Sequence, residues 1–229
     1  MGADALLIEI EDVVVPTRDA RRAAWRSALG GHGIATTERA LDAAAGLATA
    51  PAIAAILATL GATLDATGRA LAVHHADRLF TERLTAGMVL VDGAAGALET
   101  LAATARLAVV TRARRADIDF ILGLAGLASL FEVVVTGDDP VAPWPDPAPL
   151  RRAVDKLTRR RQVRAGRVVA LVDAMPAIRA ACAAGVRCVA VGAFPAHEAL
   201  AADALAASIR DITPALVAAV TQEYGEPVE

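Results

Sequence analysis

Short apolar runs that alternate with helical segments constrain the fold of this chain more than any other feature. From Leu98 onward, each apolar run is followed by a segment of helical character. This alternation is typical of a parallel sheet that helices cover on both faces. A further apolar run stands near the start of the chain. We therefore expect an α/β fold, a Rossmann-like parallel sheet whose strands begin near residues 5, 107, 131, 168 and 187.

The stretch from residue 17 to 85 shows no strand pattern. Its apolar residues recur at spacings of three and four, as Ile53, Ile56 and Leu60 do, which is the period of an amphipathic helix. Gly61 and Gly68 are expected to interrupt these helices. The chain therefore divides into an α/β core and a helical insert, formed by residues 1–16 with 86–229 and by residues 17–85.

Local signals also predict how the two ends of the chain fold. Thr17 is the expected N-cap of the first helix, because a threonine oxygen accepts bonds from free backbone N–H groups. Near the other end we expect a helix around 196–206, a short strand at 208–212 and a last helix from Pro214, since proline suits a first helical turn.

Charge and composition exclude several classes of protein. The net charge of −3 leaves no basic surface for nucleic acid. No apolar run is as long as a membrane-spanning helix, and the first residues lack a secretory signal. Cys182 and Cys188 lie among alanines and valines and are expected to be buried free thiols. We expect a soluble cytoplasmic protein with neither a nucleic-acid partner nor a membrane span.

Two acids mark the end of the first predicted strand. Glu9 and Glu11 are two positions apart, so their side chains point to the same face of the strand. Parallel strands end at one edge of the sheet, where Thr111 and Asp173 also follow strands. Carboxylate oxygens are the ligands that Mg²⁺ prefers. The pattern therefore indicates either a metal site or only a polar strand end.

With these strand ends, the chain resembles the haloacid-dehalogenase-like (HAD) superfamily over nearly its whole length. It is most similar to the branch of β-phosphoglucomutases and phosphoglycolate-type phosphatases, which inserts a helical cap after the first strand. This resemblance implies a HAD core, a helical cap at residues 17–85 and Mg²⁺-dependent phosphoryl transfer. The segments that carry it are Trp25-Arg26, Gly33-Ile34, Ala108-Val109-Val110-Thr111, Val135-Thr136-Gly137-Asp138-Asp139, Asp173, Ile178-Arg179-Ala180-Ala181 and Ala184-Gly185.

The first motif of that family reads DxDG[TV], and this chain departs from it. The first Asp attacks phosphorus and the second is the general acid/base; Glu9 and Glu11 stand at these positions, followed by Asp12 in place of glycine. The additional methylene of Glu moves the attacking oxygen by about 1.5 Å. A misplacement of about 1 Å costs on the order of a hundredfold in rate.

The later motifs depart as well. The third motif usually holds Lys-Pro, but Trp144-Pro145 stands here, and the only lysine of the chain is Lys156. A helix carries Lys156 up to about 18 Å from Trp144, so we do not expect it to substitute. Of the two acids common in the fourth motif, Asp173 alone is present.

Three arginines after the second predicted strand leave two alternatives open. Arg112, Arg114 and Arg115 either supply the positive charge that the missing lysine gave, or form only an exposed basic helix start. The resemblance implies that Thr111, with Arg112 beside it, binds phosphate. By the same resemblance, Glu9, Glu11 and Asp173 hold any Mg²⁺.

These departures lead to three hypotheses of function. The first is a catalytically impaired or inactive HAD homologue that acts as a binding, regulatory or assembly subunit with a protein partner. In that case, Trp144 is an interface anchor or fills the emptied pocket. The alternative is a Mg²⁺-dependent phosphatase or phosphosugar mutase of small phosphorylated metabolites, with Glu9 as nucleophile and Glu11 as acid/base. The third, a phosphometabolite sensor, requires a metal, because the acids otherwise repel an anion.

Overall fold

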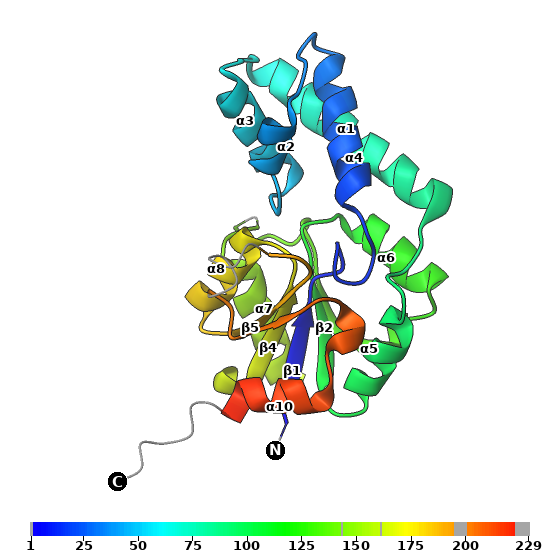
Figure 1. The fold of residues 1–229 in the computed structure, drawn as a ribbon, viewed down its shortest axis with the longest axis vertical. Coiled ribbons are helices and arrows are strands. Elements are labelled where there is room, and N and C mark those ends of the chain that lie inside the picture. Colours follow the sequence, from blue (N-terminus) through cyan, green and yellow to red (C-terminus); the bar gives the residue numbers. More distant parts are fainter. Residues whose placement is uncertain (1, 143, 161, 195–200, 223–229) are drawn as a thin grey trace. The chain divides into compact units, whose positions relative to one another are not determined.

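A six-stranded parallel sheet forms the centre of the part of the chain that the computed structural model describes, residues 2–142, 144–160, 162–194 and 201–222 (Figure 1). The spatial order is β3-β2-β1-β4-β5-β6, and every pair of neighbouring strands is parallel. The predicted fold class is confirmed. The strands are β1 (Ala5–Ile8), β2 (Arg106–Val110), β3 (Phe131–Val135), β4 (Val168–Val172), β5 (Arg187–Val191) and β6 (Ala204–Ala206).

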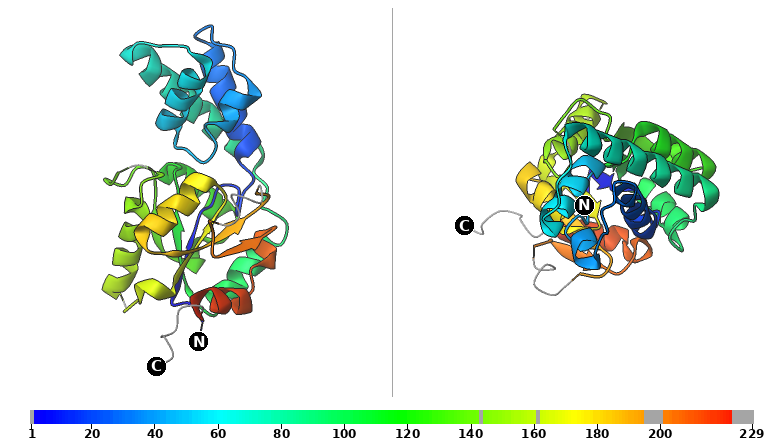
Figure 2. Two further views of the ribbon diagram at one scale, coloured as in Figure 1. Left: turned by 60° about the vertical axis from the view of Figure 1, so that its left-hand side comes forward. Right: turned by 90° about the horizontal axis from the view of Figure 1, so that it is seen from above.

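Helices cover both faces of this sheet, as Figure 1 and Figure 2 show. Helices α7 (Ala148–Arg160) and α8 (Met175–Ala184) contact each other and one face, whereas α5 (Ala94–Ala102) and α10 (Pro214–Gln222) contact strands from the other side. Helix α6 (Arg115–Leu124) follows β2. Short 3₁₀ turns occupy Ala128–Leu130, Ala165–Arg167 and Ile209–Asp211.

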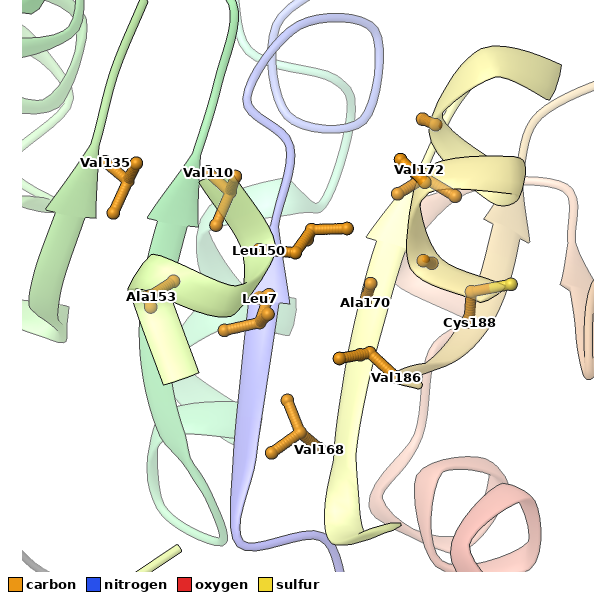
Figure 3. Close-up of a cluster of buried hydrophobic side chains, with 14 of the residues drawn as sticks. Leu7, Val110, Val135, Leu150, Ala153, Val168, Ala170, Val172, Val186 and Cys188 are labelled. Carbon is orange, nitrogen blue, oxygen red and sulfur yellow. The ribbon is translucent and has the colours of Figure 1, made fainter. Parts of the chain in front are cut away.

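The core under α7 and α8 follows from the period of two along each strand. Side chains that alternate along the strands, such as Leu7 and Val110, point to the same face and pack against α7 (Figure 3). Leu150 and Ala153 of α7 lie over the strands in that view. The layer is almost wholly aliphatic, which agrees with an aromatic content of 3%.

The second compact unit consists of helices only. It contains α1 (Arg18–Gly30), α2 (Glu38–Asp42), α3 (Thr49–Leu60) and α4 (Ala66–Gly87), and it has its own aliphatic core around Trp25. Chain contacts divide the protein into residues 1–15 with 90–229 and residues 16–89. The sequence predicted that the helical insert begins after residue 16 and ends at residue 85, within a few residues of these boundaries.

Several local predictions were wrong. Gly68 does not interrupt a helix, because Asp65 caps α4 and Gly68 donates its N–H to that carboxylate at 2.6 Å. Thr17 stands at the N-cap of α1, but its side chain makes no capping hydrogen bond. The predicted strand at 208–212 is a 3₁₀ turn, closed by a capping box between Ser208 and Asp211.

The predicted helix at 196–206 lies partly outside the described residues, and its last part is wrong. Residues 204–206 form β6, which pairs with β5. Alanine-rich composition favoured a helix there, but the free edge of β5 offers backbone partners that a short segment satisfies as a strand.

The two cysteines are free, but only one of them is buried. Cys188 lies in β5 and is buried, and burial raises the pKa of its thiol to about 12. Cys182 is exposed on α8, so the prediction of two buried thiols was wrong for it. Among the described residues, no helix has both the length and the apolar character needed to cross a bilayer.

We expect Leu7→Ala to lower the free energy of unfolding by about 2–5 kcal/mol, because Leu7 is 1% exposed in β1 and its loss leaves a cavity under α7. The matched change Leu124→Ala removes a side chain that is 64% exposed and should cost less than about 0.5 kcal/mol. Urea unfolding of both variants beside the wild type measures the difference. Equal losses in the two variants would contradict this description of the core.

Candidate functional site

The first acids of the site lie in a tight turn directly after β1. Glu9 donates its backbone N–H to Leu171 O of β4 at 3.0 Å, which holds this residue at the sheet edge. The N–H groups of Val14 and Val15 both donate to Ile10 O at 3.0 Å, so the chain turns back at once. Glu9 and Glu11 are 1% and 0% exposed. The sequence placed these acids correctly at the carboxyl end of the first strand.

Asp12 adopts a conformation that side chains disfavour. Its φ is +59°, in the left-handed region that suits glycine. Asp and Asn tolerate this region better than most residues. The turn is closed by a hydrogen bond from the Asp12 N–H to Val15 O at 2.7 Å. The aspartate therefore adopts a backbone conformation that a glycine takes without steric cost.

Thr111 follows β2 and contacts one of these acids. Its hydroxyl donates to Glu11 Oε2 and accepts from the N–H of Ala113 at 3.0 Å. Its own N–H donates to Val135 O of β3 at 3.1 Å. The hydroxyl is therefore oriented by protein groups on both sides.

Arg112 is the centre of the site. Its side chain is 2% exposed, and its guanidinium makes an ion pair with Glu9 Oε1 through Nη1. The same nitrogen lies 3.6 Å from Asp173 Oδ1, while Nε lies 3.9 Å from Glu11 Oε1 and Nη2 lies 3.8 Å from Asp12 Oδ2. The alternative of an exposed helix start is therefore wrong for Arg112, because the acids draw its guanidinium inward.

The other two arginines do form an exposed helix start. Arg114 and Arg115 are 44% and 54% exposed and pair with Asp117 and Asp119 of α6, at 3.3 and 2.8 Å. Sequence reasoning treated the three arginines alike, although only the first stands close enough to the end of β2 to turn toward the sheet edge.

Gly137 belongs to a segment that carries the family resemblance, but the sequence did not predict its role in this site. A Cβ at this position would stand 2.6 Å from the backbone oxygen of Arg112 and 3.2 Å from that of Ala113. The Gly137 N–H donates to Ala113 O at 2.8 Å. The chain after β3 therefore supports the backbone of Arg112 at a distance that only glycine allows, and a glycine after a strand was the available signal.

The fourth strand supplies Asp173, which lies directly after β4. Its N–H faces Glu9 Oε2 at 3.5 Å, and its side chain is 3% exposed. Asp138 and Asp139, by contrast, accept backbone N–H groups, from Arg115 at 2.7 Å and from Thr136 at 2.9 Å. The structure therefore brings Asp173 to the acids that follow β1. Asp138 and Asp139 instead accept hydrogen bonds from nearby backbone N–H groups.

Burial sets the protonation of Glu9. It raises the pKa of the Glu9 carboxyl well above its ordinary value, and the neighbouring Asp173 carboxylate raises it further, while Arg112 opposes the rise. The same acids raise the pKa of the Arg112 guanidinium despite its burial, so it stays charged. One guanidinium faces four carboxyl groups, and holding a proton on Glu9 relieves part of their repulsion.

Trp144 occupies the sequence position of the motif lysine, and Lys156 is the only lysine of the chain. Trp144 is 3% exposed and belongs to the core layer with α7 and α8, so it fills space in the domain and presents no exposed ring. The Lys156 ammonium lies 3.1 Å from Asp139 Oδ1, which Arg152 also approaches at 2.9 Å. Neither residue brings positive charge to Glu9.

Comparison with known proteins now decides the family. Residues 42–191, more than half of the 229 residues, match the family model described as haloacid dehalogenase-like hydrolase. The chain belongs to this HAD family. A search of curated protein sequences found no match.

Solved structures share the HAD fold of this chain. CbbY from Rhodobacter sphaeroides, in complex with phosphate, has 24% identity and a TM-score of 0.76 over 91% of this chain and 96% of that one. A β-phosphoglucomutase from Clostridium difficile has 14% identity and a TM-score of 0.83 over 97% and 98%. A predicted phosphoglycolate phosphatase from Haemophilus somnus has 18% identity and a TM-score of 0.75 over 91% and 96%. At these identities the likeness shows the fold alone.

The HAD family implies Mg²⁺, and the residues present do not fit it. The predicted ligands Glu9, Glu11 and Asp173 do meet, but the Arg112 guanidinium lies between their oxygens. In the described part of the chain, no group of three or more His, Cys, Asp or Glu is arranged to hold a metal ion. A fixed cation that shares these oxygens repels a second one, so we derive no step through a metal.

We expect Arg112→Met to lower the free energy of unfolding by about 3–5 kcal/mol, because it leaves buried carboxylates without their counter-charge. The matched change Arg115→Met removes an exposed ion pair and should cost less than about 1 kcal/mol. Urea unfolding at pH 7 compares the two. If Arg112→Met fails to fold, adding Glu9→Gln should restore folding; equal stability of the two single variants would refute the role of Arg112.

The raised pKa of Glu9 has a consequence for stability. The folded protein holds the Glu9 proton to a higher pH than the unfolded chain, in which the Glu carboxyl has its ordinary pKa of 4.5. The stability due to this proton is complete below that value and is lost as pH rises through the folded pKa. Glutamine resembles the protonated acid and does not titrate, so we expect the free energy of unfolding of the wild type to fall relative to that of Glu9→Gln as pH rises, in urea unfolding between pH 4 and 8. Parallel pH profiles would contradict the raised pKa.

Proposed function

We propose that this HAD-family protein does not transfer phosphoryl groups and acts as a binding, regulatory or assembly subunit. The observation that carries the proposal is the guanidinium of Arg112 among Glu9, Glu11, Asp12 and Asp173. Phosphoryl transfer depends on a free nucleophile, an acid/base and positive charge aimed at the phosphate.

The nucleophile is the first requirement. Glu9 is the residue at the nucleophile position, and its Oε1 is bound by Arg112 while Oε2 faces the N–H of Asp173 at 3.5 Å. Its raised pKa keeps a proton on a carboxyl that would have to attack as an anion. Both the contacts and the protonation of Glu9 therefore oppose attack on phosphorus.

The acid/base is the second requirement. Glu11 accepts a hydrogen bond from the hydroxyl of Thr111 and is 0% exposed. A general acid must reach the leaving oxygen of a substrate. Here the carboxylate and the hydroxyl that the family resemblance assigns to substrate are directed at each other.

Positive charge is the third requirement. Arg112 is already surrounded by more negative groups than it can balance, and Lys156 pairs with Asp139. A crevice with an excess of carboxylates repels an anionic phosphate. The same argument weighs against a phosphometabolite sensor at this site.

The competing function is a Mg²⁺-dependent phosphatase or phosphosugar mutase. Membership of the hydrolase family favours it, and solved structures with the same fold include a β-phosphoglucomutase and a predicted phosphoglycolate phosphatase. In that function Glu9 attacks, Glu11 is the acid/base, Thr111 and Arg112 bind phosphate and Asp173 holds the metal. It requires Arg112 to leave the acids.

Phosphate release decides between the two functions. We expect the wild type, with Mg²⁺ and either an aryl phosphate or a panel of sugar phosphates, to release no more phosphate than Glu9→Gln. Glu9→Asp should be equally inactive, because Arg112 still faces the shortened acid. Added Mg²⁺ should leave the melting temperature of the wild type unchanged, since Arg112 already occupies the acids of the described site.

Each outcome has one meaning. A HAD phosphatase run in parallel establishes that the assay works, and urea unfolding establishes that both Glu9 variants fold. Wild-type activity that Glu9→Gln abolishes would overturn the proposal and establish a glutamate nucleophile. Activity gained by Glu9→Asp would show that the remaining site is assembled, and would also overturn it.

A further inference from the structure

Strand β3 forms one edge of the sheet. It pairs with β2 on one side, and no other strand of the described residues pairs with it. Val135 O accepts the N–H of Thr111, so the backbone polar groups of Val135 face β2. Consecutive residues of a strand direct these groups to opposite sides, and those of Val134 therefore face away from the sheet. Such an edge is a template for a further strand.

A groove of about 680 Å³ runs along this edge. Four consecutive residues of β3, Phe131 to Val134, line it together with residues of α6 and α7. Four strand residues span about 13 Å. Val134, which is half-buried, and Ala128, which is exposed, give it apolar surface. The groove therefore offers both backbone partners and an apolar floor to an extended segment of about four to six residues.

The side chains around the groove carry an excess of positive charge. Its lining contains Arg115, Lys156 and Arg159 against Asp119 and Glu132. Both acids are already paired, Asp119 with Arg115 at 2.8 Å and Glu132 with Arg106 at 2.7 Å. Asp139, which is not part of the lining, is shared by Arg152 and by Lys156 of the lining. Asp119, Glu132 and Asp139 are thus matched by bases within the protein, and Arg159 leaves the lining with one more basic than acidic side chain.

We propose that this groove binds an extended acidic segment of a partner protein, which adds as a strand beside β3. Backbone hydrogen bonds to β3 give the affinity, and acidic side chains directed at Arg159 and its basic neighbours give the selectivity. A second copy of this chain fits less well, since pairing β3 with itself brings two basic surfaces together. The inference rests on the proposed binding role. It adds that the partner binds in the groove along β3 and that its binding segment is acidic and extended.

The probe is a fluorescein-labelled hexapeptide of alternating glutamate and valine, and its control replaces glutamate by lysine. We expect the acidic peptide to bind the full-length protein saturably in fluorescence anisotropy, and the basic peptide not to bind. Binding of the acidic peptide should weaken as salt rises, because exposed charges are screened. Equal binding of the two peptides would overturn the proposal.

Two further comparisons locate the peptide on β3. Arg159→Glu should weaken binding by about tenfold, whereas Arg179→Glu on α8, outside the groove lining, should leave it unchanged. N-methylation at alternate peptide positions blocks one strand edge and leaves the other free. One of the two methylated peptides should therefore lose binding while the other retains it. Equal effects within either pair would refute strand addition at β3.

The remaining outcomes also separate this inference from the proposed function. A dimer in sedimentation that dissociates in Val134→Pro but not in Val134→Ala would mean that a second copy covers β3, and would overturn the acidic partner. Absence of peptide binding in a protein that also lacks phosphate release overturns the inference and leaves the proposed function standing. Peptide binding by a protein whose activity Glu9→Gln abolishes overturns the proposed function alone.

Discussion

The ion pairs of Arg112 join the ends of three neighbouring strands. Arg112 follows β2, Glu9 follows β1 and Asp173 follows β4, and these strands lie side by side in the sheet. Buried carboxylates that repel each other need a counter-charge in the same place. The strand ends can converge here because a guanidinium is built into the chain at the end of β2.

The same interaction connects the fold of this family to the function that we propose. A HAD core brings the ends of its parallel strands to one edge, whatever side chains those ends carry. In this chain the side chains at this edge contact one another: Thr111 donates to Glu11, and Arg112 donates to Glu9. The fold is independent of phosphoryl transfer, since its core is the aliphatic layer under α7 and α8.

The sequence predicted most of the fold because hydrophobic periodicity is a local property. The first strand, its acids and the helical insert were all visible in the spacing of residues. The errors lie where tertiary contacts override local preference. Residues 204–206 pair with β5 although their composition favours a helix, and Gly68 lies inside α4 because Asp65 caps that helix first.

The sequence by itself determined the parallel sheet, the family resemblance and the positions of Glu9, Glu11, Thr111 and Asp173 at strand ends. Only the tertiary structure decided which of three adjacent arginines faces those acids. That choice depends on the order of the strands and on Gly137, whose missing side chain lets the backbone approach Arg112. A side chain's partners depend on distances between segments far apart in the chain, and no local pattern contains those distances.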